Sequence, residues 1–261
     1  MMMKLNRAVV VVVGGNGLLG RNLIATIKAL DCSPFRIISV GHNPNSEADA
    51  NVILSDCTGE HYSGALSKLM GELSIEGSTP ISAVFCCAGG WRGGSSGISG
   101  GSTSSGSGQF VQSVFEMWDK NVASASFAAA LSPALTDGGL MVYVSSSASM
   151  GPTPSMIGYG LSKAAVNHLV ASLAAEVVNR DAHRPTPSGT VVVSLLPGTL
   201  DTPSNRDAMP SVDGRYLSWT PLEEVSRRLV LWLTAPSSRP SPGALVLVNT
   251  KDGLTSFEEQ I

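Results

Sequence analysis

Residues 8–20 read AVVVVVGGNGLLG, a run of β-branched residues followed by a glycine-rich turn. The valine run has the composition of a buried strand, and the apolar periodicity after Gly17 predicts a helix. Gly15-x-Gly17-x-x-Gly20 stands between them. A dinucleotide pyrophosphate requires this order, because glycines permit a tight turn while N–H groups at the helix start face the phosphates. The alternative is a glycine turn that only packs strand on helix.

The alternation of strand and helix continues along the chain. Strand-like runs cover 8–13, 36–40, 52–54, 81–87, 140–144, 190–196 and 244–248, and helix-like segments cover 18–30, 61–73, 110–131, 159–178 and 222–234. This order predicts an α/β fold, a doubly wound parallel sheet with helices on both faces. Such a sheet binds ligands at the carboxyl ends of its strands, so we expect the chemistry in the loops that follow them.

The composition argues against several classes of partner. The chain has 261 residues, 43% hydrophobic and 14% charged, which fits a single domain over 1–261. A net charge of -3 without a Lys/Arg run argues against nucleic acid. No apolar run near the start approaches the roughly 20 residues that cross a bilayer, so no membrane partner is expected. The strand beginning at Ala8 leaves too little chain for a targeting peptide, which favours a cytoplasmic location.

The four cysteines show no metal-binding pattern. Cys32, Cys57, Cys86 and Cys87 include no Cys-x-x-Cys pair and no matching His spacing. We therefore expect no metal site and interpret the cysteines as reduced, mostly buried residues. A catalytic thiol is the alternative, but no partner histidine is indicated.

One segment interrupts the alternation. Residues 93–108 read GGSSGISGGSTSSGSG and contain almost nothing that can be buried. We predict a flexible surface insertion there. Because the segment follows a strand end, a lid over the site is the alternative.

Tyr159 and Lys163 are four residues apart at the start of a predicted helix, so their side chains share one face. A nearby ammonium is expected to lower the pKa of a tyrosine from about 10, which would let Tyr159 act as an acid near neutral pH. Ser146 lies thirteen residues earlier, just after a predicted strand, where its hydroxyl can contact the reacting substrate atom. Ser145 and Ser147 are alternatives for that role.

The end of the second predicted strand bears on the choice of dinucleotide. It reads Ser39-Val40-Gly41-His42-Asn43-Pro44, with no acid to hold the adenosine ribose hydroxyls. Without that carboxylate a 2′-phosphate is not repelled, and His42, Asn43 or Arg21 can contact it. This favours NADPH, or use of both NADPH and NADH. Asp56, after the third strand, can accept a hydrogen bond from the adenine amine; an ordinary surface acid or helix cap is the alternative.

The glycine turn, Ser146, Tyr159-x-x-x-Lys163 and Pro197-Gly198-x-x-x-Thr202 together resemble the short-chain dehydrogenase/reductase family over essentially the whole chain. The resemblance implies a Rossmann-type sheet of about seven strands and a homodimer that pairs through the helices at 110–131 and 159–178. It also implies that Asn121 anchors a water to Lys163 in a proton relay; a helix asparagine without a role is the alternative. The residues that it assigns to the dinucleotide, in addition to His42, Asn43 and Asp56, are Gly14, Gly15, Asn16, Gly17, Leu18, Leu19, Gly20, Ala88, Gly89, Gly90, Pro197, Gly198 and Thr202.

Further stretches resemble the pterin-reducing members of that family: Ala88-Gly89-Gly90-Trp91, 151–160 (GPTPSMIGYG), 199–210 (TLDTPSNRDAMP) and 218–222 (SWTPL). They imply an oxidoreductase that reduces a quinonoid dihydropteridine such as dihydrobiopterin to its tetrahydro form, with Tyr159 as proton donor. Trp91 is the candidate aromatic wall for this flat substrate; packing in the core or over the cofactor is the alternative.

Three features depart from the pattern of mammalian pterin reductases: Ser146 and Asn121 are present, the acid after the second strand is missing, and the glycine-serine insertion is added. A broader carbonyl or pteridine reductase therefore remains an alternative. Another alternative is a dinucleotide-sensing protein without catalytic activity. The presence of Ser146, Tyr159 and Lys163 together argues against it.

Overall fold

A computed structural model describes residues 7–55, 59–74, 80–92, 105–178, 186–209 and 215–260. Its centre is one sheet of eight strands in the order β3-β2-β1-β4-β5-β6-β7-β8. The strands are β1 (Ala8–Val13), β2 (Phe35–Gly41), β3 (Ala50–Ile53), β4 (Ile81–Cys86), β5 (Leu135–Val144), β6 (Val191–Pro197), β7 (Leu245–Lys251) and β8 (Leu254–Gln260). The neighbouring pairs from β3 to β7 are all parallel. The expected doubly wound α/β fold is confirmed.

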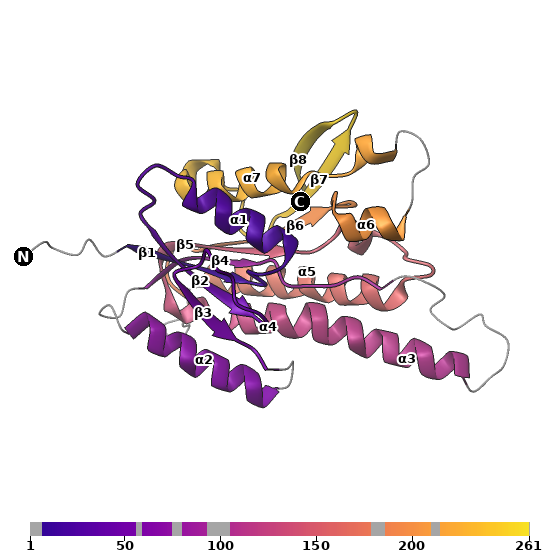
Figure 1. Ribbon diagram of the computed structural model, residues 1–261, viewed down its shortest axis with the longest axis horizontal. Coiled ribbons are helices and arrows are strands. Elements are labelled where there is room, and N and C mark those ends of the chain that lie inside the picture. The colour runs from indigo at the N-terminus through magenta and orange to yellow at the C-terminus, as the bar shows by residue number, and fades with distance from the viewer. Residues whose placement is uncertain are drawn as a thin grey trace, which may run out of the picture.

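Helices cover both faces of the sheet (Figure 1). They are α1 (Leu18–Lys28), α2 (Gly59–Ser74), α3 (Ser105–Met117), α4 (Ser124–Ala129), α5 (Ile157–Val178), α6 (Pro203–Ala208) and α7 (Leu222–Thr234). In Figure 1, α1 and α7 lie above the sheet, and α2, α3 and α5 lie below it. None of the helices in the described residues is long and apolar enough to cross a membrane.

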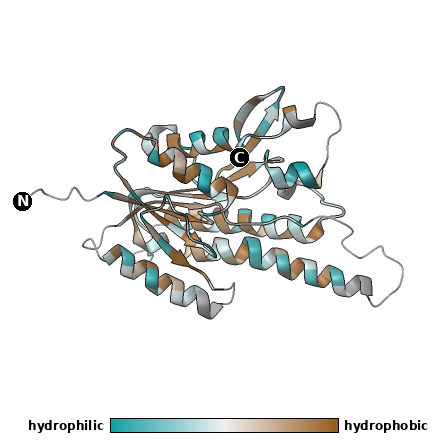
Figure 2. Ribbon diagram, in the orientation of Figure 1, coloured by the Kyte–Doolittle hydropathy of each residue, from teal (hydrophilic) through white to brown (hydrophobic). Residues whose placement is uncertain are grey.

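The valine run forms the centre of the sheet because both of its faces are covered. Val9, Val11 and Val13 pack into the core on one side, whereas Val10 and Val12 pack into the core on the other. A strand buried on both faces reads as a continuous apolar run instead of an alternating one. Figure 2 shows the same distribution, with hydrophobic strands between the two helical layers.

The strand order reverses between β1 and β4. From β1 the chain builds outward to β3, then returns so that β4 pairs with the opposite edge of β1. The loops that follow β1 and β4 diverge to opposite faces, which leaves a crevice at the carboxyl ends of these strands. The predicted glycine turn and the Ala88–Trp91 stretch both lie there.

The sequence did not predict β8, which pairs antiparallel with β7 at the edge of the sheet. Its sequence, LTSFEEQ, is largely polar, because an edge strand can leave one face in solvent. The turn between the two strands is Asp252-Gly253, and both residues have positive φ, 50° and 77°. An Asp-Gly pair of this kind is a strong hairpin signal.

Three helical segments also differ from prediction. The helix expected at 110–131 is divided by a π-helical segment, η1 (Trp118–Ala123), between α3 and α4. A flexible insertion was predicted at 93–108, and this prediction is wrong at 105–108, which form the first turn of α3. The other residues of the predicted insertion, 93–104, lie outside the described residues. Packing of α3 against α5 stabilises a helix that serine and glycine alone disfavour. The short helix α6 was not predicted, although Thr202 and Pro203 form a recognisable cap.

Leu229 and Leu231 lie two residues apart on α7 but differ in burial, at 0% and 43% exposed. We expect Leu229→Ala to lower the free energy of unfolding by about 2–5 kcal/mol, because it leaves a cavity in the core. The matched Leu231→Ala should change it by about 0.5 kcal/mol or less. Urea unfolding followed by circular dichroism measures both values. Equal losses would contradict the orientation of α7 on the sheet.

Candidate active site

A cavity of about 620 Å³ opens at the carboxyl edge of the sheet. Its walls come from the segments that follow β4, β5 and β6, from the start of α5, and from α6 and the residue after it. Tyr159, Lys163, Ser146 and Trp91 all line it, together with Ala88, Gly89, Gly90, Pro197, Gly198 and Leu19. The cavity thus brings together ten of the 21 residues that the sequence singled out for the site.

The glycine-rich turn is too tightly packed to accept side chains. A Cβ on Gly14, whose φ is +82°, would lie 2.5 Å from the Ala88 nitrogen, and one on Gly20 would lie 2.2 Å from the Gly14 oxygen. Gly17 is the N-cap of α1; no side chain caps that end, and the first turn contains no acid. Unpaired N–H groups and the positive end of the helix dipole remain there for an anion. The turn, including Asn16 and Leu18, therefore fits a dinucleotide pyrophosphate.

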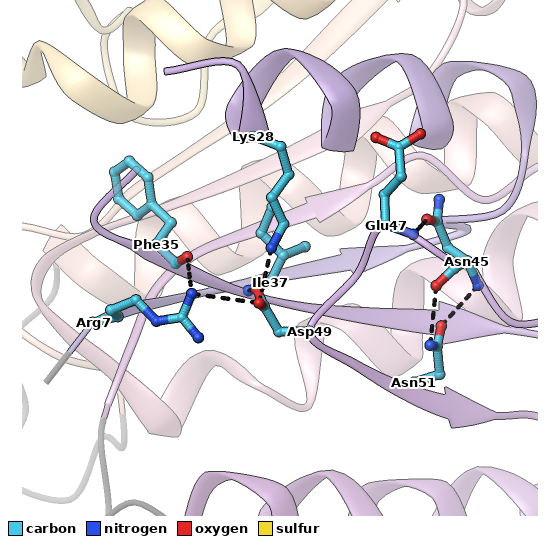
Figure 3. Close-up of polar contacts among 8 residues, drawn as sticks. All are labelled: Arg7, Lys28, Phe35, Ile37, Asn45, Glu47, Asp49 and Asn51. Carbon is cyan, nitrogen blue, oxygen red and sulfur yellow. Dashed lines mark hydrogen bonds and ion pairs between the residues drawn. The ribbon is translucent and has the colours of Figure 1, made fainter. Parts of the chain in front are cut away.

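A pair of asparagines, Asn45 and Asn51, holds the loop after β2 against this turn. The buried Asn45 amide nitrogen donates to the Gly15 oxygen at 2.8 Å. Asn51 in turn accepts from the Asn45 backbone N–H at 2.8 Å and donates to the Asn45 carbonyl at 3.1 Å (Figure 3). The sequence analysis did not single out Asn45, since a loop asparagine gives no signal for a contact thirty residues away.

The last residue of β2 is Gly41, so no side-chain carboxylate stands at this strand end. A Cβ built there meets its nearest atom, the Gly14 Cα, at 4.0 Å, so there is room beside the strand end. His42 and Asn43 are exposed and outside the cavity lining; the His42 Nδ1 lies 3.0 Å from the Leu54 oxygen. The Arg21 Nε donates to the Asn16 oxygen at 2.7 Å, which holds this guanidinium near the turn. Asp56 lies outside the described residues.

Tyr159 and Lys163 lie on one face of α5, as their spacing predicts. The Lys163 ammonium is buried, donates to the Val144 oxygen at 2.9 Å, and lies 5.9 Å from the centre of the Tyr159 ring. Ser146 caps a short 3-10 turn and also hydrogen-bonds Tyr159. Ser145 instead donates to the Lys163 carbonyl oxygen at 3.1 Å, which favours Ser146 as the hydroxyl of the site.

Burial shifts both ionisable groups toward their neutral forms. It raises the pKa of Tyr159, although the Ser146 hydrogen bond acts in the opposite direction. It also lowers the pKa of Lys163 to about 8, opposed by the nearby Cys86 thiol. The prediction that Lys163 lowers the pKa of Tyr159 is therefore wrong in this structure, because burial raises that pKa and Lys163 is not among the groups that shift it. The consequence is a tyrosine that holds its proton and a lysine that titrates near neutral pH.

Asn121 lies in the π-helical segment η1 and is 1% exposed. Its amide oxygen accepts from the Gly90 N–H at 3.0 Å, and its amide nitrogen donates to the Gly90 oxygen at 3.1 Å and to the Ser162 hydroxyl at 3.0 Å. The extra residue in a π turn re-aims side chains in this way. Asn121 thus fastens the loop after β4 to α5. The water-mediated link from Asn121 to Lys163 stays a prediction.

The remaining candidates occupy the other walls. Thr202 is nearly buried and accepts the Asn205 N–H at 3.1 Å as the cap of α6, outside the cavity lining. Trp91 is 47% exposed and stands at the cavity with its indole N–H directed to the Met156 sulfur. Cavity residues that were not among the predicted site residues include Met156, Asn205 and Met209. All three fall within the stretches that carried the pterin-reductase resemblance. In the described residues no cluster of His, Cys, Asp and Glu fits a metal ion.

Comparisons with known proteins agree with this fold and these motifs. A family model described as short chain dehydrogenase matches residues 93–212. A dihydropteridine reductase from Dictyostelium discoideum is 33% identical over 249 residues, which are 95% of this chain and 97% of that protein.

Two solved structures show a similar fold at low identity. A short chain dehydrogenase family protein from Francisella tularensis subsp. tularensis SCHU S4 has a TM-score of 0.70 at 16% identity, over 92% of this chain and 96% of that one. The aldohexose dehydrogenase of Thermoplasma acidophilum, in ligand-free form, has a TM-score of 0.68 at 18% identity, over 95% of this chain and 94% of that one. From the sequence match over nearly its whole length, the chain belongs to the short-chain dehydrogenase/reductase family of oxidoreductases.

Proposed function

We propose that this protein is an NAD(P)H-dependent dihydropteridine reductase, which reduces a quinonoid dihydropteridine to its tetrahydro form. The observation that carries the proposal is that an exposed indole, Trp91, lines the same cavity as Tyr159, Lys163 and Ser146. An aromatic face suits a flat, electron-poor bicyclic substrate. The relative from Dictyostelium discoideum, a dihydropteridine reductase, supports this substrate class.

In this proposal, the bound nicotinamide supplies a hydride from its C4. Tyr159 supplies the proton to a ring nitrogen of the substrate, since burial keeps its hydroxyl protonated until then. Lys163, with a pKa of about 8, can return a proton to Tyr159 near neutral pH. Ser146 orients the Tyr159 hydroxyl, and the N–H groups of the glycine turn hold the pyrophosphate.

A broader carbonyl or pteridine reductase is a second candidate, favoured by the pairing of Ser146 with Tyr159. Two hydroxyls that line one cavity can hold a carbonyl oxygen as well as a ring nitrogen. The two candidates differ in which substrate is turned over fastest.

The function is tested by supplying quinonoid dihydropterin with NADH and NADPH separately, in an assay that regenerates the unstable substrate. We expect a higher kcat/KM for it than for 7,8-dihydropterins or aldehydes. A preference for aldehydes would favour the broader reductase. Binding of dinucleotide without turnover of any of these substrates would favour a sensor.

Tyr159→Phe removes the proposed proton donor while keeping the ring. We expect kcat to fall by about 10²-fold or more, as is typical for loss of a general acid, with dinucleotide affinity within about threefold of wild type by fluorescence titration. The matched control is Tyr62→Phe, on α2 and away from the cavity. Wild-type turnover in the Tyr159 variant would show that the substrate needs no acid from this residue.

We also propose that the protein uses NADPH, or both dinucleotides. The support is the bare end of β2, where Gly41 leaves space beside the glycine turn and no carboxylate to repel a 2′-phosphate. Arg21 and His42 are the nearby groups that can favour it.

Gly41→Asp introduces the missing carboxylate. Because a carboxylate repels the 2′-phosphate and accepts from ribose hydroxyls, we expect the ratio of kcat/KM for NADPH to that for NADH to fall by about tenfold or more. Gly71→Asp, on an open position of α2, is the control for added charge. An unchanged ratio in Gly41→Asp would place the discrimination elsewhere.

We propose a homodimer that pairs through α3 and α5. Val111, Phe115 and Trp118 form an exposed apolar stripe at helical spacing along α3 and the start of η1, at 51%, 64% and 44% exposed. Ile157 and Leu161 continue the apolar surface on α5, which packs against α3. An exposed apolar stripe of this kind is typical of an interface.

Phe115→Glu places a charge in the middle of this stripe. Sedimentation velocity at micromolar concentration should show a dimer for the wild type and a monomer for the variant. Leu231→Glu, exposed on α7 at the opposite face of the sheet, should remain dimeric. A monomeric wild type would exclude the proposed dimer.

We further propose that the sheet and its helices act as one catalytic unit in the cytosol. The free thiols of Cys32, Cys86 and Cys87 fit a reducing compartment.

A further inference from the structure

The indole of Trp91 makes a contact that the proposed reaction does not use. Its Nε1 donates a hydrogen bond to the sulfur of Met156 at 3.4 Å, across 65 residues of sequence. Both residues line the cavity. Within the described residues, this sulfur is the hydrogen-bond acceptor found for the indole N–H.

The backbone around Trp91 is fixed, but the ring is not buried. Asn121 holds Gly90 through two hydrogen bonds, and Arg92 pairs with Glu116 on α3. The indole itself is 47% exposed, so packing alone restrains it weakly. A half-exposed side chain on a fixed backbone still samples several rotamers. The contact to Met156 is a hydrogen bond that can select among them.

The start of α5 places Met156 at that position. A turn is closed by the Met156 N–H, which donates to the Thr153 oxygen at 3.1 Å, and Ser155 within it has a φ of +69°. Thr153 packs directly on Gly160, where a Cβ would lie 2.1 Å from the Thr153 hydroxyl oxygen. The Gly160 N–H then donates to the Met156 oxygen at 3.1 Å. The residue beside Tyr159 thus anchors the turn that presents Met156.

We propose that Met156 is a positioning residue that fixes the orientation of the Trp91 ring, and through it the orientation of a flat substrate stacked on that ring. This inference rests on the proposed function for the identity of the substrate. A thioether suits the task because it accepts a weak hydrogen bond and also makes favourable contacts with aromatic rings. Met156 acts through Trp91 and takes no part in proton or hydride transfer.

Two substitutions separate the sulfur contact from simple packing. Met156→Leu keeps an apolar side chain of similar size but removes the acceptor, whereas Met156→Gln restores an acceptor on a chain of similar length. Met150→Leu is the control, since Met150 is 52% exposed and outside the cavity lining. The sequence has four tryptophans, so the Trp91 indole N–H signal can be assigned in a ¹H–¹⁵N spectrum with Trp91→Phe.

In Met156→Leu we expect the Trp91 indole signal to shift and its hydrogen exchange to accelerate. The KM for quinonoid dihydropterin should rise by about three- to tenfold, the size of one weak contact, while kcat stays within about twofold. Met156→Gln should restore both the signal and most of the KM. Met150→Leu should change neither.

The proposal is overturned if Met156→Leu leaves the indole signal and the KM unchanged, or if Met156→Gln behaves like Met156→Leu. A shifted signal without a change in KM also overturns it, because the ring orientation would then not matter to the substrate. Failure of the proposed function is distinguishable: the wild type would not reduce quinonoid dihydropterin, whereas the indole signal would still respond to Met156→Leu. In that case KM is measured with the substrate that the assay identifies.

Discussion

The close approach of two backbone turns, at Gly14 after β1 and Ala88 after β4, is the constraint on which the site depends. A Cβ on Gly14 would lie 2.5 Å from the Ala88 nitrogen, so the two turns can meet only because that position is glycine. They meet where the strand order reverses. The start of α1, whose first N–H groups no side chain caps, and the loop that carries Trp91 are thereby brought to one crevice. A side chain at Gly14 would force the two turns apart and separate the start of α1 from the cavity.

From that crevice, hydrogen bonds made by side chains extend the fixed region to the start of α5. Gly90 is held by Asn121, and the same amide donates to Ser162, which lies between Tyr159 and Lys163 on α5. Lys163 is anchored on the Val144 oxygen at the end of β5. The segments at the ends of β4 and β5 are therefore both tied to α5. Burial raises the pKa of Tyr159 and lowers the pKa of Lys163, so both groups are shifted toward their neutral forms.

The sequence predicted the parts of the fold that have a strong local signal. The valine strand, the glycine turn and the Tyr159/Lys163 spacing each carry their pattern within a few residues, and the structure places them as expected. The edge strand β8 was missed because its polar composition does not distinguish it from a loop. The π segment was missed because the tertiary contact that accompanies it, from Asn121 to Gly90, is not revealed by periodicity within one helix. The predicted direction of the Tyr159 pKa shift was wrong for a related reason: residue spacing predicts that two side chains are close, but not how far they are desolvated.

The two halves of the cavity are held by different kinds of contact. On the side of the glycine turn, backbone groups and glycines without room for a Cβ leave little that a substitution can change without disrupting the fold. On the opposite side, side chains of Trp91, Met156 and Met209 form the wall, in which the indole of Trp91 donates to the Met156 sulfur. Substitutions that alter substrate range are therefore better tolerated on the second side. A shared fold can retain its dinucleotide chemistry while this wall changes, which is why the substrate must be argued from these side chains and not from the fold.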